Sequence, residues 1–184
     1  MKIILDLGCG NDKLKPKRGE KVIGVDCIKH KSVDIVHNLE KSLPFPKNYA
    51  DFIYSNHAFE HVVNAKRLIE ECWRICKSEG EIFIRVPHYT SEGMYTDLTH
   101  KTFFSSRSLD FYIKGTYLST MSGYNPKIRF NLIKKMIIFA LPYKPFEYIV
   151  NINDFTRKIY EYFFCWIFPS TEIIFMLKPI KKYD

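Results

Sequence analysis

The sequence predicts an α/β fold built on a parallel sheet, because short apolar runs in its N-terminal half alternate with glycine turns and acids. The first run, IILDL at residues 3–7, leads directly into Gly8 and Gly10. A second run, VIGV at residues 22–25, ends on Asp26. Runs of this length are typical of buried parallel strands, and glycine lets the backbone turn sharply and approach a ligand closely. Strand, glycine turn, strand and acid in this order are typical of the nucleotide-binding half of an α/β sheet.

The first four strands are expected at residues 2–7, 21–25, 33–36 and 50–54. A parallel crossover usually needs about a dozen residues or more, and too few residues separate the first three strands to hold full helices. The sequence therefore predicts trimmed early crossovers that leave one face of the sheet partly uncovered. Either a second subunit, as in a homodimer, or the C-terminal segment is expected to cover that face.

A helix is expected over residues 64–77, with Asn64 as its N-cap and Gly80 as its stop. Its buried face is formed by apolar residues that recur at helical spacing: Leu68, Ile69, Cys72, Trp73 and Cys76. We expect both cysteines in the core rather than at a metal, since a metal site would need two further ligands at suitable spacing. A fifth strand, at residues 81–86, follows the helix.

The segment of residues 88–126 differs from the rest of the chain, because it is polar, aromatic and punctuated by glycine. One helix is expected in it, near residues 106–113, with Ser105 or Ser106 as its cap. Long segments between strands are usually lids or binding loops, and this one leaves the carboxyl end of a strand, where open α/β sheets bind ligands. We interpret it as a substrate-recognition insertion or lid within a single domain spanning residues 1–184.

The C-terminal part completes the sheet. We expect a strand at residues 127–140, an aromatic helix at 155–166 and a last strand at 171–177. A chain of 184 residues, 46% of them hydrophobic, has enough apolar material for one domain with a packed core.

The glycine turn gives little support to dinucleotide binding. The G-x-G-x-x-G fingerprint needs a third glycine where Lys13 stands, and Pro16 and Gly19 weaken the helix that would receive a pyrophosphate. Asp6 and Asp26 instead suit a ligand that has a positive charge and a ribose. S-adenosylmethionine fits this description, because it carries a sulfonium, an ammonium and a ribose but no phosphate.

Three segments resemble the class I S-adenosylmethionine-dependent methyltransferases, in particular their small, type 11-like members: LDLGCG at residues 5–10, VIGVD at 22–26 and LPFPKNYADFIYSNHAFEHV at 43–62. They are similar to the family's first motif, its second motif and the region around its fourth strand. The resemblance, which covers roughly the first half of the chain, implies a Rossmann-like sheet of seven strands. It also implies that the seventh strand runs antiparallel beside the fifth, and that S-adenosyl-L-methionine is the cofactor.

The resemblance implies cofactor contacts at one set of positions: Asp6, Gly8, Cys9, Gly10, Asp26, Asn38, Leu39, Ser55, Asn56 and His57. Asp6 would lie near the ammonium group, and Asp26 would accept hydrogen bonds from both ribose hydroxyls. Asn38 stands where the family often has an acid that accepts from the adenine amino group, and Leu39 would pack on the ring; a strand-end turn is the alternative for both. The backbone at residues 55–56 would meet the methionine amine, and His57 would touch the carboxylate or line the acceptor site.

The segment DLTHKTFFS at residues 97–105 resembles a D-x-T-H-x-x-F-F-S segment of small methyltransferases, several of which are linked with polysaccharide biosynthesis. An Asp–His pair can orient an imidazole and raise its basicity, so Asp97 and His100 are candidate catalytic residues. They can equally lock a lid, and as scattered potential ligands they are weak evidence for a metal; we predict none. His61 is expected to face the active site, with helix capping and packing as its alternative.

The predicted activity is methyl transfer to an oxygen or nitrogen of a small molecule or glycan. RNA is a first alternative acceptor, which the net charge of +8 permits. It is not favoured, because no RNA-binding module is visible and no N-P-P-Y-type tetrapeptide follows the fourth strand. A second alternative is a catalytically idle subunit that binds the cofactor.

The sequence favours a cytoplasmic protein with reduced thiols. Its five cysteines suggest no disulfide framework. No signal peptide is expected before the first strand, and no apolar run approaches the roughly 18 residues of a transmembrane segment.

Overall fold

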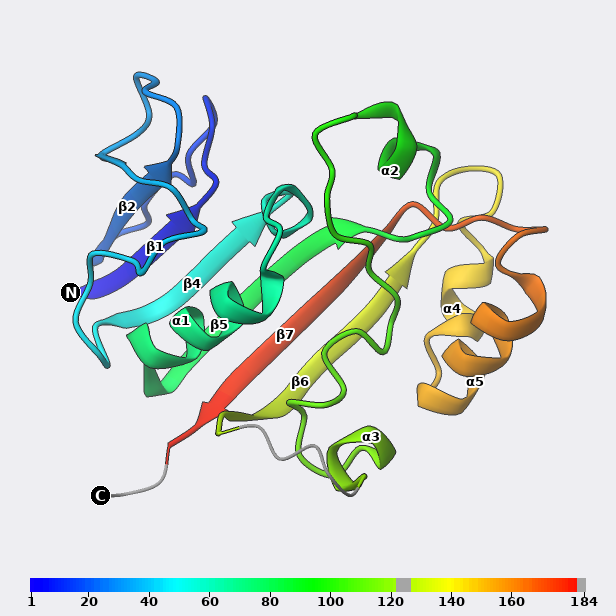
Figure 1. Cartoon of the computed structure of the whole chain (residues 1–184). Helices are drawn as coiled ribbons and strands as arrows, with labels where there is room; N and C mark the ends of the chain where they lie inside the picture. Colours follow the sequence, from blue (N-terminus) through cyan, green and yellow to red (C-terminus); the bar gives the residue numbers. More distant parts are fainter. Residues whose placement is uncertain (122–126, 182–184) are drawn as a thin grey trace.

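The computed structural model describes residues 1–121 and 127–181 of the chain. Seven strands form one sheet in the order β3-β2-β1-β4-β5-β7-β6 (Figure 1). Their bounds are Lys2–Leu7 for β1, Glu20–Asp26 for β2, Ile35–Val36 for β3, Ala50–Asn56 for β4, Cys76–Pro87 for β5, Arg129–Ile138 for β6 and Glu172–Ile180 for β7. The pairs among β1 to β5 are parallel, whereas β7 is antiparallel to both β5 and β6. The predicted Rossmann-like sheet with an antiparallel seventh strand is therefore confirmed.

Helices are few and short. They are Ala65–Ile75 for α1, Glu92–Thr96 for α2, Tyr117–Thr120 for α3, Phe146–Val150 for α4 and Asp154–Ile159 for α5, with a 3-10 turn at Phe59–His61 and a π-helical turn at Tyr160–Phe164. No α-helix lies between β1 and β4, a stretch that is described throughout, so the prediction of trimmed early crossovers is confirmed. Within the described ranges no helix is long and apolar enough to cross a membrane.

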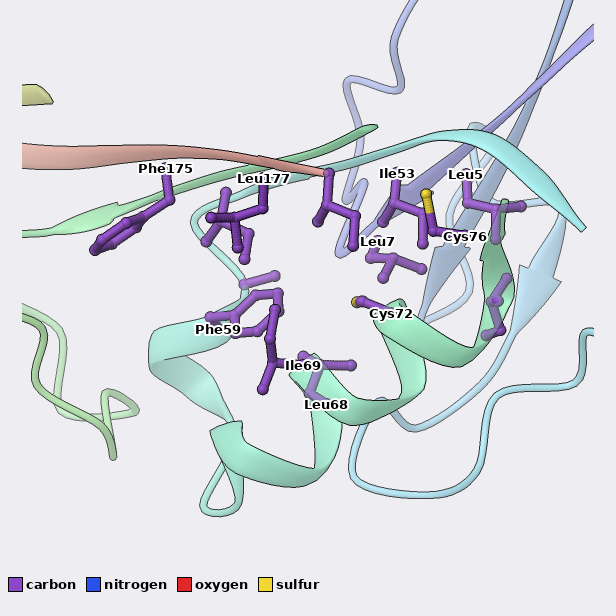
Figure 2. Close-up of a cluster of buried hydrophobic side chains, with 14 of the residues drawn as sticks. Leu5, Leu7, Ile53, Phe59, Leu68, Ile69, Cys72, Cys76, Phe175 and Leu177 are labelled. Carbon is purple, nitrogen blue, oxygen red and sulfur yellow. The ribbon is translucent and has the colours of Figure 1, made fainter. Parts of the chain in front are cut away.

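The main core lies between α1 and one face of the sheet (Figure 2). Asn64 is the N-cap of α1, as expected, because its side chain accepts a hydrogen bond from Arg67 N. Leu68, Ile69 and Cys72 of α1 are buried against alternate strand residues: Leu5, Leu7, Ile53, Ile82, Ile84, Phe175 and Leu177. Each fully buried side chain of this kind contributes at most about 1.5–3 kcal/mol. Cys72 and Cys76 are core residues, as predicted.

The opposite face of the sheet presents the intervening strand residues. Tyr54 of β4 and Phe83 of β5 are partly exposed there and stack with ring centroids 5.1 Å apart. In a full α/β fold the helices of the first crossovers would cover such a face. The homodimer proposed to cover it stays a prediction.

The predicted stop of α1 at Gly80 is wrong. The helix ends at Ile75, Cys76 already has extended backbone, and β5 runs from there through Gly80. A Cβ built on Gly80 would lie only 2.9 Å from the Asp51 carbonyl oxygen. Gly80 thus permits the close approach of β4 and β5 near a register shift, and it marks a strand irregularity rather than a helix end.

The predicted helix at residues 106–113 is also wrong, because the structure has turns there. The Ser105 hydroxyl accepts from Arg107 N and so caps a turn. Downstream, Phe130 of β6 donates its N–H to the Tyr112 carbonyl, and its own carbonyl accepts from Lys114 N. Pairing with the edge of the sheet therefore replaces helical hydrogen bonds.

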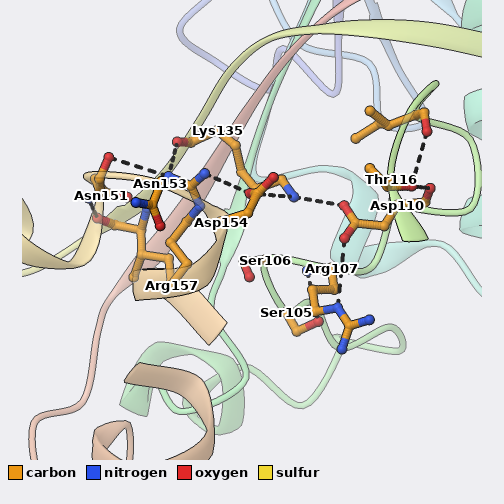
Figure 3. A network of polar contacts seen from close by, with 12 residues as sticks. Ser105, Ser106, Arg107, Asp110, Thr116, Lys135, Asn151, Asn153, Asp154 and Arg157 are labelled. Carbon is orange, nitrogen blue, oxygen red and sulfur yellow. Dashed lines mark hydrogen bonds and ion pairs between the residues drawn. The ribbon is translucent and has the colours of Figure 1, made fainter. Parts of the chain in front are cut away.

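A polar network fixes the same segment to the C-terminal helices (Figure 3). The Lys135 ammonium, on β6, lies 2.7 Å from Asp110 Oδ1 and 3.4 Å from Asp154 Oδ1. Arg157 of α5 donates to the same Asp154 at 2.6 Å. The aromatic helix expected over residues 155–166 is found as α5 followed directly by the π-helical turn, and α4 was not expected. Residues 122–126, the end of the predicted lid, lie outside the described residues.

Candidate cofactor and acceptor site

Two cavities flank the glycine turn at the carboxyl ends of β1, β2 and β4. The larger, of about 670 Å³, is lined by Gly8, Gly10, Asp26, Cys27, Ile28, His30, Asn38, Leu39, Glu40, His57, Ala58, His61, Val62, Thr99 and Lys101. The second, of about 640 Å³, is lined by Asp6, Gly8, Cys9, Asn11, Asp12, Lys13, Leu14, Lys15, Tyr54 and Asn56. Both volumes lie in the range of small-molecule sites. Gly8 borders both cavities, so one elongated ligand could pass along this turn.

The glycine turn has the backbone that only glycine adopts easily. Gly8 has φ +74° and Gly10 has φ +49°, in the region that costs other residues about 1–2 kcal/mol. Gly8 N donates to the Val25 carbonyl at 2.8 Å, which fastens the turn to β2. A Cβ on Gly8 would also lie 2.3 Å from the Ala58 Cβ. Strain and space therefore both require glycine at this position.

Asp26 is oriented by backbone donors before any ligand binds. Its Oδ2 accepts from Gly10 N at 2.9 Å, and its Oδ1 accepts from Ile28 N at 3.0 Å. Each carboxylate oxygen has a further lone pair, and the residue lines the larger cavity. The carboxylate can therefore accept from two neighbouring hydroxyl groups, such as those of a ribose.

The second cavity offers acceptors that suit a cation. Asp6 is buried, its Oδ2 accepts from Leu14 N at 2.8 Å, and burial raises its pKa. Asn56 Oδ1 is buried and has no hydrogen-bond partner among the described residues. A buried acceptor without a partner is costly, and an ammonium group would supply the missing donor. Burial also raises the pKa of the Cys9 thiol to about 11, so this cysteine stays neutral at pH 7.

The other predicted cofactor residues differ in which of their atoms remain available to a ligand. Asn38 Oδ1 accepts from Glu40 N at 2.8 Å, as the strand-end turn predicts, and retains a second lone pair toward the larger cavity. Leu39 is buried beside Gly8. The Ser55 hydroxyl donates to the Leu7 carbonyl at 3.2 Å and lines neither cavity. Ser55 thus joins β4 to β1 with its side chain and leaves only its backbone for a ligand.

His57 is held as a cation by two carboxylates. Its Nδ1 lies 3.0 Å from Glu60 Oε1 and its Nε2 lies 2.8 Å from Glu172 Oε1. The hydrogen bonds to Glu172 and then to Glu60 outweigh burial and raise the His57 pKa to about 9. Arg85 also pairs with Glu172. With both ring nitrogens donating, His57 cannot act as a base, but it can stabilise an anionic group.

His61, which lines the larger cavity, and His100 lie against each other, with ring centroids 4.7 Å apart. His61 Nδ1 lies 2.9 Å from the Thr99 hydroxyl, which itself donates to Asp97 Oδ1 at 2.7 Å. His100 Nδ1 lies 3.0 Å from the Met94 carbonyl oxygen. Asp97 Oδ2 is 3.9 Å from His100 Nε2, beyond hydrogen-bond distance. The structure therefore brings the three predicted catalytic residues together, with Thr99 linking Asp97 to His61.

The predicted lid segment is fastened to the turn that follows β4. The Glu60 carbonyl accepts from Lys101 N at 2.7 Å and from Thr102 N at 3.1 Å. Lys101 Nζ reaches Glu40 Oε1 at 3.2 Å and so joins the lid to the loop after β3. The roles of Glu172 and Arg85 could not be predicted from the spacing of residues in the sequence, since His57 and Glu172 are 115 residues apart. Thr99, by contrast, lies within the DLTHKTFFS segment and could have been singled out.

Comparisons with known proteins show the fold and find a family model that matches the N-terminal part of the chain. Residues 5–84 match the model of a family described as methyltransferase domain. The comparison with curated proteins found no match. Among solved structures, a SAM-dependent methyltransferase from Archaeoglobus fulgidus is similar at 19% identity with a TM-score of 0.56, over 96% of this chain and 86% of that chain.

Two further solved structures are similar over nearly the whole chain. A putative methyltransferase from Bacillus halodurans C-125 has 13% identity and a TM-score of 0.59, over 97% of this chain and 92% of that chain. A chain of the complex between the Haloferax volcanii Trm112 methyltransferase activator and the putative methyltransferase has 15% identity and a TM-score of 0.54, over 97% and 83%. At these identities the likeness to solved structures shows the fold alone.

Proposed function

We propose that the chain is a class I S-adenosylmethionine-dependent methyltransferase, since a methyltransferase-domain model matches residues 5–84 and the fold is that of solved methyltransferases. We propose further that it methylates an oxygen or nitrogen of a small molecule or glycan. The observation that carries this proposal is that two kinds of residue line the same cavity. Gly8, Gly10 and Asp26 line one part of it, and His61 and Thr99 line another. The first set suits a nucleoside, and the second suits a polar acceptor.

The residues present fit the cofactor. The Gly8 turn is a cradle that a Cβ would fill, Asn56 has an orphaned buried oxygen, and Asp26 is oriented by backbone donors. When bound, S-adenosylmethionine supplies the activated methyl group, so the protein has mainly to orient the reactants and exclude water.

The roles of the chain's own residues follow from this chemistry. Asp26 holds the ribose, Asp6 and Asn56 take the ammonium, and Leu39 packs on the adenine. The lid residues Thr99 and His100 meet the acceptor beside His61. Only an acceptor that must lose a proton needs a base, and His100 Nε2 has the free lone pair for that task.

Transfer of radiolabelled methyl groups tests this function. The protein is incubated with labelled S-adenosylmethionine and panels of hydroxyl- and amine-bearing small molecules, oligosaccharides and RNA fragments. Label in a hydroxyl or amine of the first two panels supports the proposal, and label in RNA alone would replace it with the RNA alternative. Cofactor binding without transfer to any acceptor would favour the idle subunit.

A further inference from the structure

Three potential metal ligands from distant parts of the chain meet beside the larger cavity. Glu60 and His61 come from the 3-10 turn after β4, and His100 comes from the lid; one ligand atom of each lies within 4.8 Å of the others. The lid is fastened there by Lys101 N and Thr102 N on the Glu60 carbonyl. The cluster is therefore set by the fold and is not a chance meeting of mobile surface side chains.

Hydrogen bonds leave the same nitrogen free on both imidazoles. The Met94 carbonyl can only accept, so His100 Nδ1 carries the hydrogen. The Thr99 hydroxyl uses its hydrogen on Asp97, so its oxygen accepts from His61 Nδ1. In the neutral tautomer that these bonds favour, the lone pair of each ring lies on Nε2, where a cation could bind. Metal-binding histidines almost always donate their other ring N–H to such a partner.

Glu60 presents a carboxylate oxygen that nothing satisfies. Its side chain is 0% exposed, and its Oε1 accepts from His57 Nδ1. Its Oε2 is buried and has no hydrogen-bond partner among the described residues. Burying an unpaired carboxylate oxygen is costly. A cation at this position would remove that cost.

We propose that Glu60, His61 and His100 bind a divalent transition-metal ion through one carboxylate oxygen and two Nε2 atoms. Two imidazoles and a carboxylate suit Zn²⁺, Mn²⁺ or Fe²⁺ better than Mg²⁺ or Ca²⁺, which prefer sets of oxygen ligands. Ligand bonds of about 2.0–2.2 Å place the atoms of a tetrahedral set about 3.5 Å apart. The cluster therefore contracts by about 1 Å when it binds the ion.

Three protein ligands leave further coordination positions open, as in catalytic rather than structural metal sites, and one of the three, His61, lines the larger cavity. An acceptor oxygen could occupy one of the open positions, in which case His100 is a ligand and not a base. That role rests on the proposed function. Binding of the ion itself does not, so it is tested without acceptor or cofactor.

The test is a metal titration of the full chain after removal of bound metal with a chelator. Zn²⁺ and Mn²⁺ are titrated against the protein in competition with a chromophoric chelator, and Co²⁺ is used as a spectroscopic probe. We expect one ion per chain and a Co²⁺ absorption spectrum typical of nitrogen and oxygen ligands. His61→Ala and His100→Ala should each weaken binding by about tenfold or more, and Thr99→Val by about tenfold to a hundredfold, as for outer-shell partners of other metal sites.

His37→Ala is the matched control, because His37 bonds to the Ser42 carbonyl and lies outside the cluster and both cavities. It should leave metal affinity unchanged. Circular dichroism and S-adenosylhomocysteine titration check that each variant is folded. Absence of binding to the wild type, or full binding by the folded double variant His61→Ala/His100→Ala, would overturn the proposal. Loss of metal binding with retained cofactor binding distinguishes this site from the cofactor site.

Discussion

Gly8 and Ala58 approach so closely that a Cβ on Gly8 would lie 2.3 Å from the Ala58 Cβ. This contact sets the turn of β1 against the start of the loop after β4, the two segments between which the proposed cofactor lies. Gly8→Ala should therefore weaken S-adenosylhomocysteine binding by about 5- to 150-fold, since overpacking of this kind costs about 1–3 kcal/mol. Isothermal titration measures the affinity.

Gly19→Ala is the matched control for this change. Gly19 also has positive φ, +84°, but a Cβ there meets nothing within 4 Å. Gly19→Ala should introduce the same backbone strain as Gly8→Ala, about 1–2 kcal/mol, but it should leave the affinity for S-adenosylhomocysteine unchanged. Equal losses of affinity in the two variants would show that strain, and not the Ala58 contact, is responsible.

His100→Ala should leave S-adenosylhomocysteine affinity within about threefold, because His100 lines neither of the two cavities beside Gly8. Methyl transfer should fall by about 10²–10⁴-fold if His100 takes a proton. Addition of a metal chelator separates this role from metal binding. Methyl transfer that uses His100 as a general base should continue in the presence of the chelator, whereas transfer that needs a metal ion bound to His100 should stop. Unchanged transfer in His100→Ala would remove the residue from both roles.

Lys135→Ala should destabilise the fold by about 3–5 kcal/mol, because it leaves buried charge without its partner. The Lys135 side chain is 1% exposed and pairs with Asp110, whose pKa burial raises (Figure 3). Urea unfolding followed by circular dichroism gives the free energy. The neighbouring Lys134→Ala is the control, since Lys134 is exposed and such surface changes cost within about 0.5 kcal/mol. Equal effects of the two changes would contradict the role given to the network.

The net charge of +8 should not produce tight RNA binding. We expect no submicromolar complex with tRNA or rRNA fragments at physiological salt in a filter assay. A submicromolar complex whose affinity falls steeply with salt, as counterion release requires, would promote RNA to the favoured acceptor.

The sequence predicted features that depend on local patterns. The glycine turn, Asp26 and the apolar face of α1 are read from residues within one or two elements, where backbone geometry and hydrophobic spacing decide the outcome. Turns 106–113 and strand residues 76–80 were missed because pairing with distant strands overrides local helix preference there. The pairing of His57 with Glu172 and the meeting of Glu60 with His100 depend on tertiary contacts alone.

The central claim is that Asp26 holds the ribose of S-adenosylmethionine. Isothermal titration should show binding of S-adenosylhomocysteine to the wild type and little or no binding of NADH. Asp26→Ala removes two hydrogen bonds to a charged acceptor, each worth about 1.5–3 kcal/mol, so affinity should fall by about tenfold or more, while Glu79→Ala, on an exposed residue outside both cavities, should not change it. An unchanged dissociation constant for Asp26→Ala would contradict the account.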